Sequence, residues 1–384
     1  MESVELLKKL VSLNSVFPNA SELAHYLADE LKKQGFSVEL QKWGDNRFNV
    51  LAKRGTKGKP ILLYGHMDTV PAYGYDAVGR KPQELIEKEG KLYGLGGYDM
   101  KAGIAAIVKA VEETKGKTDR AIKIMFVSDE EADSTGAYEV SKTEFFSDVE
   151  VAIATEISDV HDLNEKTRAI TLGRRGRIQY EIKVPGKSFH AARLEHGISA
   201  VTEASKLAIE LEKMNSELPK HAKLSHGSQH VRKFYSESLS LSIPDEAIML
   251  LDRHLVPPET IESARLEIEE KINELYKKGI LKEAEGKRAT ITVKKRYVPY
   301  MSPYTTPENN PYVEKLAKTI EKTLGAKAKI NYGMSVADEN LIAMQGIPVI
   351  SYGPIGEGEH SNKEWVSKKS YLELIEVLKN FLSS

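Results

Sequence analysis

Four strongly apolar runs, in which polar and apolar residues do not alternate, occur at 60–65, 121–128, 150–156 and 347–353. Continuous apolar runs of this length are typical of strands that are buried on both faces of a sheet. Segments with helical periodicity lie between several of them, such as 101–116. This order predicts an α/β domain in which helices flank a mixed, largely parallel sheet.

The middle of the chain, from about 169 to 297, shows a different order of patterns. Here we expect a strand at 169–184, a helix, two strands at 236–243 and 247–256, a second helix and a last strand. This is the β-α-β-β-α-β order of a ferredoxin-like unit. Residues 297–311 contain four Pro and no periodicity, so they are predicted to form a return linker. The expected organisation is therefore a first domain of residues 1–170 and 298–384 that is interrupted by an inserted domain of residues 171–297.

Composition excludes several classes of protein. The formal net charge is -1, so no overall field attracts nucleic acid or an anionic membrane. No run approaches the roughly 20 apolar residues of a membrane span, and the N-terminus lacks the apolar core of a signal peptide. We therefore expect a cytoplasmic protein with neither of these partners. Because the chain has no Cys, any metal must be held by His, Asp and Glu.

Ionisable residues follow the ends of the four apolar runs and a glycine-rich turn. In order along the chain they are His66 and Asp68, Asp99 in the turn, Glu130 and Glu131, Glu156, and His360. Ligands of open α/β sheets bind outside the carboxyl ends of the strands, so we expect these side chains to converge there. Packed carboxylates would repel one another, and one or two divalent cations would remove that repulsion.

A dinuclear metal site suits this set of residues. The predicted ligands, with one carboxylate as the bridge, are His66, Asp99, Glu131, Glu156 and His360. Nitrogen and oxygen ligands of this kind favour two Zn²⁺, with Co²⁺ or Mn²⁺ as substitutes. Two ions about 3.5–4 Å apart can hold a bridging water and lower its pKa toward ~7.

Two further carboxylates are predicted to act beside the metal ligands. In extended backbone, His66 and Asp68 point to the same side, so Asp68 is expected to fix the imidazole from behind. Glu130 and Glu131 are neighbours and point apart in extended backbone, so one can bind metal while the other faces the substrate as a general base. His190 lies in a Pro-Gly loop between the first strand and first helix of the inserted domain, but the pattern alone assigns it no target.

Each motif has a less specific interpretation. A single His at a strand end is usually structural, and an isolated "DEE" usually lies in a solvated loop or at a helix N-terminus. The "GLGG" turn raises the alternative of a nucleotide-binding α/β protein, but its third Gly is displaced and no G-K-[ST] follows. The metal interpretation is favoured because five ligand-type residues lie after buried runs or on a glycine turn.

Six motifs occur in order: "GHMDTVP", "LYGLGGYDMKAGIAA", "VSDEEADSTGA", "ATEIS", "KSFHAARLEHGISA" and "GPIGEGEHSNKEWV". With them, essentially the whole chain resembles the co-catalytic zinc metallopeptidase family of acetylornithine deacetylase, succinyl-diaminopimelate desuccinylase, aminoacylase and glutamate carboxypeptidase. The resemblance implies two Zn²⁺ per subunit, with Asp99 as the bridge and Glu130 as the base. It also implies a homodimer through the inserted lid domain, whose His190 polarises the scissile carbonyl in the partner subunit.

The chain departs from the family pattern at four positions, Ile157, Leu194, Ser199 and His254. At position 254 the family usually has an Arg that contacts the substrate carboxylate. Arg253 precedes this position, but neighbours in a strand point to opposite sides. The substrate-binding candidates named from the sequence are Arg253 and Ser335. The resemblance implies hydrolysis of an N-acyl amino acid amide. The alternatives are a metallo-carboxypeptidase or dipeptidase, and a non-catalytic metal-binding homologue, against which the presence of Glu130 argues.

Overall fold

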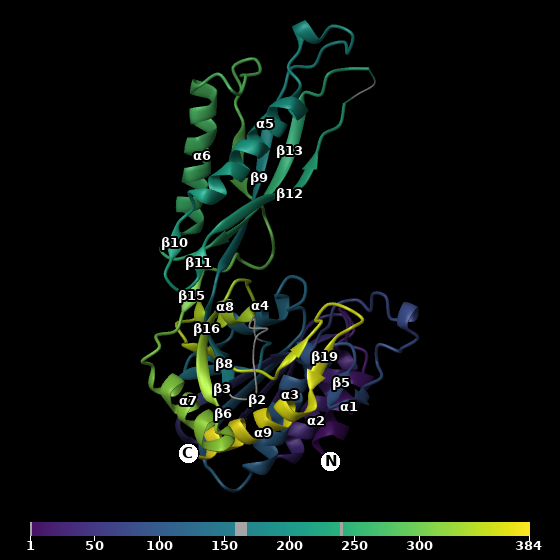
Figure 1. Cartoon of the computed structure of the whole chain (residues 1–384), viewed down its shortest axis with the longest axis vertical. Coiled ribbons are helices and arrows are strands. Elements are labelled where there is room, and N and C mark those ends of the chain that lie inside the picture. Colours follow the sequence, from purple (N-terminus) through teal and green to yellow (C-terminus); the bar gives the residue numbers. More distant parts are fainter. Residues whose placement is uncertain (1, 158–166, 239–240) are drawn as a thin grey trace. The chain divides into compact units, whose positions relative to one another are not determined.

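The computed structural model describes residues 2–157, 167–238 and 241–384. The chain forms two compact units (Figure 1). Unit 1 comprises Met1–Arg174 and Thr305–Ser384, and unit 2 comprises Arg175–Tyr304.

A nine-stranded mixed sheet forms the centre of unit 1. Its order is β1 (Ser37–Gly44), β2 (Arg47–Arg54), β6 (Arg120–Val127), β3 (Lys57–His66), β7 (Val151–Ala154), β17 (Val349–Ser351), β8 (Thr167–Arg174) and β15 (Tyr304–Thr305), with β16 (Lys327–Gly333) also paired to β8. The neighbours β6, β3, β7 and β17 are mutually parallel. These are the four predicted apolar runs, so their carboxyl ends lie along one edge of the sheet.

Helices pack on this sheet as predicted (Figure 1). They are α1 (Ser3–Ser12), α2 (Ser21–Lys33), α3 (Ala102–Glu113), α4 (Thr135–Ser141), α7 (Pro311–Leu324), α8 (Asp338–Ala343) and α9 (Lys368–Ser383). α9 packs against α3 and α7, and α1 packs against α3. Local signals set their ends: Asn310 caps α7 ahead of Pro311, and Gly325 ends it with a φ of 65°.

Unit 1 also contains a small four-stranded sheet. Its order is β18 (Gly356–Glu357), β19 (Trp365–Ser367), β5 (Lys91–Tyr93) and β4 (Ile86–Lys88), and every pair is antiparallel. β18 and β19 form a hairpin whose connecting loop carries His360.

Unit 2 has its own apolar core between two helices and an antiparallel sheet. The sheet order is β12 (Ser228–Tyr235), β13 (Glu246–Leu255), β9 (Gly176–Pro185) and β14 (Thr290–Val293), and the helices are α5 (Ala200–Lys213) and α6 (Ile261–Lys277). A short hairpin of β10 (Lys220–His221) and β11 (Ser225–His226) lies apart from it. The chain order β9-α5-β12-β13-α6-β14 is the predicted β-α-β-β-α-β pattern, so the predicted fold class is confirmed.

Two strand predictions in this region were wrong in detail. The run 169–184 was expected to be one strand, but it divides into β8 of unit 1 and β9 of unit 2. The strand expected at 236–243 lies earlier, as β12, because the long strand β13 pairs with residues 228–235. Residues 239–240 of that expected strand lie outside the described part of the chain. Within the described residues, no helix is long and apolar enough to cross a membrane.

Candidate metal site

His66 is the last residue of the buried central strand β3, and its side chain is only 1% exposed. Its Nε2 atom lies 3.0 Å from Asp99 Oδ1 and 3.7 Å from Glu156 Oε2. Asp99 comes from the turn Gly97–Lys101 directly before α3, and Glu156 comes from the segment after β7. Three segments that are distant in sequence therefore place one histidine and two carboxylates in contact.

His360 approaches the same aspartate from the β18–β19 loop. Its Nε2 atom lies 3.4 Å from Asp99 Oδ2 and 3.0 Å from Glu131 Oε2. Asp99 thus turns one carboxylate oxygen toward each histidine, which is the disposition that a bridging ligand requires. Ligand atoms of His66, Asp99 and Glu131 all lie within 4.8 Å of one another.

The charges in this cluster fit a divalent cation. Burial and the nearby charge of Asp99 raise the pKa of Glu156 to about 8. Hydrogen bonds to Asp99 and Glu131 raise the pKa of His360 to about 11. Among the described residues, the buried Glu156 Oε2 atom has no hydrogen-bond donor. These three observations reflect an excess of negative charge that a bound metal ion would neutralise.

Asp68 is fully buried and contacts both His66 and the "DEE" loop. The backbone carbonyl of Asp68 lies 3.1 Å from His66 Nδ1, whereas its carboxylate Oδ1 lies 3.7 Å away. Since a carbonyl oxygen can only accept, Nδ1 carries the proton and Nε2 is left to bind a metal. The carboxylate itself accepts hydrogen bonds from the backbone N–H groups of Glu130 and Glu131, at 3.2 and 3.0 Å.

Glu130 therefore lies in a loop that is anchored close to the histidine. Burial raises the pKa of its carboxyl well above the usual range, although His66 opposes the rise. The preceding Asp129 has a φ of 82°, and its carboxylate accepts from the Thr135 N–H at the start of α4. These bonds fix the backbone on both sides of Glu130.

The sequence analysis missed the group that holds Asp99. The buried Glu364 carboxylate accepts from the backbone N–H groups of Gly96, Tyr98 and Asp99, at 2.9, 2.8 and 3.1 Å. Residue 364 is one of three acids in a polar loop sequence, so only its partners, more than 260 positions away, reveal its role. The buried Lys101, which donates to the Leu13 carbonyl at 3.0 Å, was missed for the same reason.

His190 lies in unit 2 on an exposed loop. Its Nδ1 atom accepts a hydrogen bond from the Ala192 N–H at 3.2 Å. This contact places the ring proton on Nε2, so the exposed side of the ring is a hydrogen-bond donor.

The two substrate-binding candidates differ in accessibility. Arg253 is 0% exposed, and its Nη2 atom lies 2.5 Å from both Glu259 and Glu267 inside unit 2. Because the side chain is fully buried and its Nη2 atom is held by two carboxylates, we leave Arg253 out of the proposed site. Ser335 is exposed in unit 1, and its hydroxyl accepts from Arg174 at 3.1 Å.

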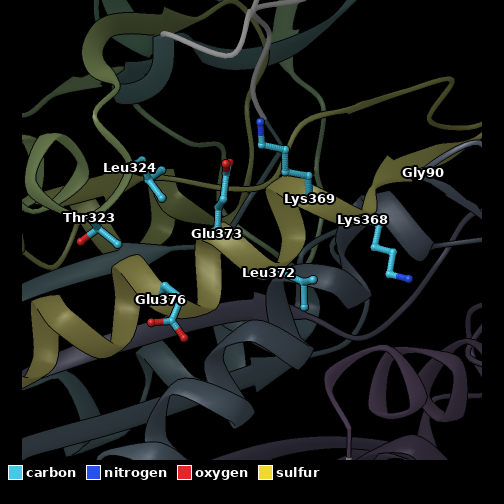
Figure 2. Close-up of a pocket in the computed structure, with 8 residues that line it drawn as sticks. All are labelled: Gly90, Thr323, Leu324, Lys368, Lys369, Leu372, Glu373 and Glu376. Atoms are coloured by element: carbon cyan, nitrogen blue, oxygen red, sulfur yellow. The ribbon is translucent and has the colours of Figure 1, made fainter.

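A separate hollow of about 570 Å³ lies along α9, beside the end of α7 and Gly90 (Figure 2). The charged side chains that border it include Lys368 and Glu373, which form ion pairs with Glu87 and Arg168. None of the predicted site residues lines this hollow, so it is distinct from the candidate metal site.

The fold and the residues at the strand ends define a class of protein, the metal-dependent hydrolases that act on C–N bonds. More particularly, the family model of peptidase family M20/M25/M40 matches residues 62–384, and the chain belongs to this family. The resemblance noted from the six motifs is thereby confirmed.

Relatives and solved structures cover nearly the whole chain. A succinyl-diaminopimelate desuccinylase of Sulfurovum sp. (strain NBC37-1) is 27% identical over 384 residues, covering 99% of this chain and 98% of the relative. A tripeptidase from Staphylococcus aureus has the same fold, with a TM-score of 0.79, 21% identity and coverage of 99% and 97%. A dinuclear metal binding peptidase of the M20 family from Bacillus subtilis gives a TM-score of 0.72 at 13% identity, with coverage of 99% and 96%.

Proposed function

We propose that this protein is a dinuclear zinc amidohydrolase that cleaves the amide bond of an N-acyl amino acid. The observation that carries the proposal is the position of Asp99 between His66 and His360. Glu156 and Glu131 complete the two halves of the site, and Glu130 lies beside them. The similarity to a succinyl-diaminopimelate desuccinylase over almost the full length supports an N-acyl amino acid as substrate.

In this proposal the metal ligands are His66, Asp99, Glu131, Glu156 and His360, with Co²⁺ or Mn²⁺ able to replace Zn²⁺. When bound, the ions polarise the substrate carbonyl and acidify a water molecule. The Nδ1–H of His66 remains on the Asp68 carbonyl and keeps Nε2 directed at the site. Glu364 holds the turn that carries Asp99.

Glu130 is the proposed general base. It accepts a proton from the water that attacks the amide carbon, and it passes this proton to the nitrogen as the C–N bond breaks. Asp68 holds the Glu130 backbone in position during both transfers. The Nε2–H of His190 donates to the carbonyl oxygen, on which negative charge develops in the transition state.

We further propose that His190 acts in the partner subunit of a homodimer formed by unit 2. Strand β12 is at the edge of its sheet, where unpaired backbone groups can bind a second copy. Phe234 and Tyr235 on β12 and Ile209 on α5 are exposed, with Ile209 at 55%. Exposed apolar side chains on an edge strand and its neighbouring helix support such an interface. A cytoplasmic location stays a prediction from composition.

A metal-dependent assay tests this function. We expect a chelator to abolish hydrolysis and Zn²⁺ or Co²⁺ to restore it, on a panel of N-succinyl and N-acetyl amino acids and dipeptides. Because the family model is that of a peptidase family, cleavage of a dipeptide or release of a C-terminal residue is the second candidate. The substrate with the highest kcat/KM distinguishes them. Full activity of the metal-free protein would contradict both.

A further inference from the structure

The two histidines of the candidate site are supported very differently. His66 ends a buried central strand and is 1% exposed, whereas the His360 side chain is 54% exposed. His360 also has a φ of 59°, in a loop between two strands of two and three residues. A ligand on such a loop needs anchors outside the loop if it is to stay in position.

Glu364 anchors only one side of this loop. Its carboxylate binds the Gly96–Asp99 turn and holds the chain where β19 begins. Within the loop, Ser361 bonds back to the Gly358 carbonyl at 2.7 Å, which shapes the turn but does not tie it to the rest of unit 1. The position of His360 therefore depends on a contact made by another residue near it.

Asn362 makes that contact with the segment 74–80. Its side-chain Nδ2 donates to the Gly74 carbonyl at 2.6 Å, and its backbone carbonyl accepts from the Arg80 guanidinium. Asn362 therefore both donates a hydrogen bond to this segment and accepts one from it. The Arg80 guanidinium is in turn held over the rings of Tyr75 and Tyr93, at 5.8 and 5.3 Å from their centroids.

The interacting ring residues connect this segment to the body of unit 1. Tyr75 is buried, with 3% of its surface exposed. Tyr93 lies in β5 and pairs with Trp365 of β19, the strand that follows the His360 loop. Segment 74–80 therefore contacts the His360 loop through Asn362. Through Arg80 it also contacts Tyr93 of β5, the strand that pairs with β19.

We propose that Asn362, Gly74 and Arg80 form a latch that positions His360 and sets the affinity of the metal ion on the His360 side. The proposal rests on the proposed function, in which His360 is a ligand. Asn362 is a positioning residue, because it acts through the loop rather than on the substrate. The ion held by His66 does not depend on the latch, since β3 and the Asp68 carbonyl fix that histidine.

Two glycines of the segment offer a matched pair of variants. Gly74 and Gly79 have similar left-handed φ values, 73° and 64°, so replacement by Ala strains the backbone of both. A Cβ atom at Gly74 would lie 2.9 Å from Asn362 Nδ2, whereas one at Gly79 would meet nothing within 4 Å. Gly74→Ala must displace the Asn362 side chain, and Gly79→Ala is the control for backbone strain.

The experiment measures Zn²⁺ binding by competition with a chelator for the wild type, Asn362→Ala, Gly74→Ala, Gly79→Ala and His360→Ala. We expect Asn362→Ala and Gly74→Ala to lower the Zn²⁺ affinity of the weaker binding step, which we assign to the His360 side, by about threefold to tenfold. The affinity of the stronger step is expected to stay unchanged. The loss of one hydrogen bond gives an effect of this size. In the metal-free proteins, amide hydrogen exchange of residues 358–364 is expected to accelerate in these two variants and not in Gly79→Ala.

His360→Ala separates failure of the latch from failure of the proposed function. His360→Ala is expected to lower the Zn²⁺ affinity of the weaker binding step. If it does so while Asn362→Ala and Gly74→Ala match Gly79→Ala in both Zn²⁺ affinity and hydrogen exchange, the latch is wrong and the metal site stands. If the wild type binds fewer than two ions, or His360→Ala binds them unchanged, the proposed function itself is wrong, and the latch with it. A weakening of both steps would also overturn the latch.

Discussion

Asp68 and Glu130 show how one buried carboxylate positions another. The i, i+2 spacing correctly suggested that Asp68 would lie beside His66, but the hydrogen-bond contact with the ring is made by the backbone carbonyl. The carboxylate instead accepts the N–H groups of Glu130 and Glu131. A single residue therefore sets the tautomer of the histidine and the position of the loop that carries the proposed base.

Glu130→Gln keeps the shape of this site and removes the proton acceptor. We expect kcat to fall by about 10²–10⁴-fold, the usual contribution of general acid-base catalysis, with both metal ions retained. The measurements are steady-state kinetics and metal content. Glu39→Gln, at an exposed carboxylate on the edge strand β1, is the control. A fully active Glu130→Gln enzyme would show that another group is the base.

Helix α3 approaches the end of β7 unusually closely. A Cβ atom at Gly103 would lie 2.5 Å from both the carbonyl oxygen and the hydroxyl of Thr155, the residue before Glu156. The apolar pattern predicted this helix, but it did not predict that the helix backbone would touch the segment that carries Glu156, a proposed metal ligand. The packing of α3 therefore affects the position of Glu156.

Gly103→Ala tests that connection. In an open helix interior this change stabilises a protein by about 0.5–1 kcal/mol, because Gly loses more backbone freedom on folding. Here the added methyl group must displace α3 or the Thr155 backbone, and overpacking of this kind costs about 1–3 kcal/mol. We expect a lower free energy of unfolding in urea and weaker Zn²⁺ binding. A gain in stability would mean that the gap is larger than the structure indicates.

At the scale of the whole molecule, unit 1 contains the candidate metal ligands and the proposed base, while His190 belongs to unit 2. A reaction that needs both units requires a defined way to bring them together. The proposed homodimer supplies one, because the partner's unit 2 then completes each site.

Co-expression of His190→Ala and Glu130→Gln subunits tests this arrangement. Each variant alone is expected to be nearly inactive. If His190 acts in the partner subunit, one site of every mixed dimer contains both wild-type residues, so random assembly restores about one quarter of the sites. Light scattering checks that the protein is dimeric. No recovery of activity in verified mixed dimers would place His190 and Glu130 of one active site in the same chain.

Local patterns in the sequence determined the class of fold and the residues worth considering. Continuous apolar runs predicted the four central strands, and the acids and histidines after them could be named because burial on both faces and strand ends are local features. The family resemblance added roles for His190 and Glu130 that no spacing provides.

Only the tertiary structure decided which groups support that site. The order β6-β3-β7-β17, the hold of Glu364 on the Asp99 turn and the bonds of Asn362 to Gly74 and Arg80 all join residues far apart along the chain. The same is true of the ion pairs between the buried Arg253 and Glu259 and Glu267, for which we left Arg253 out of the proposed site. Such contacts depend on how elements pack in three dimensions, and no periodicity in the sequence records them.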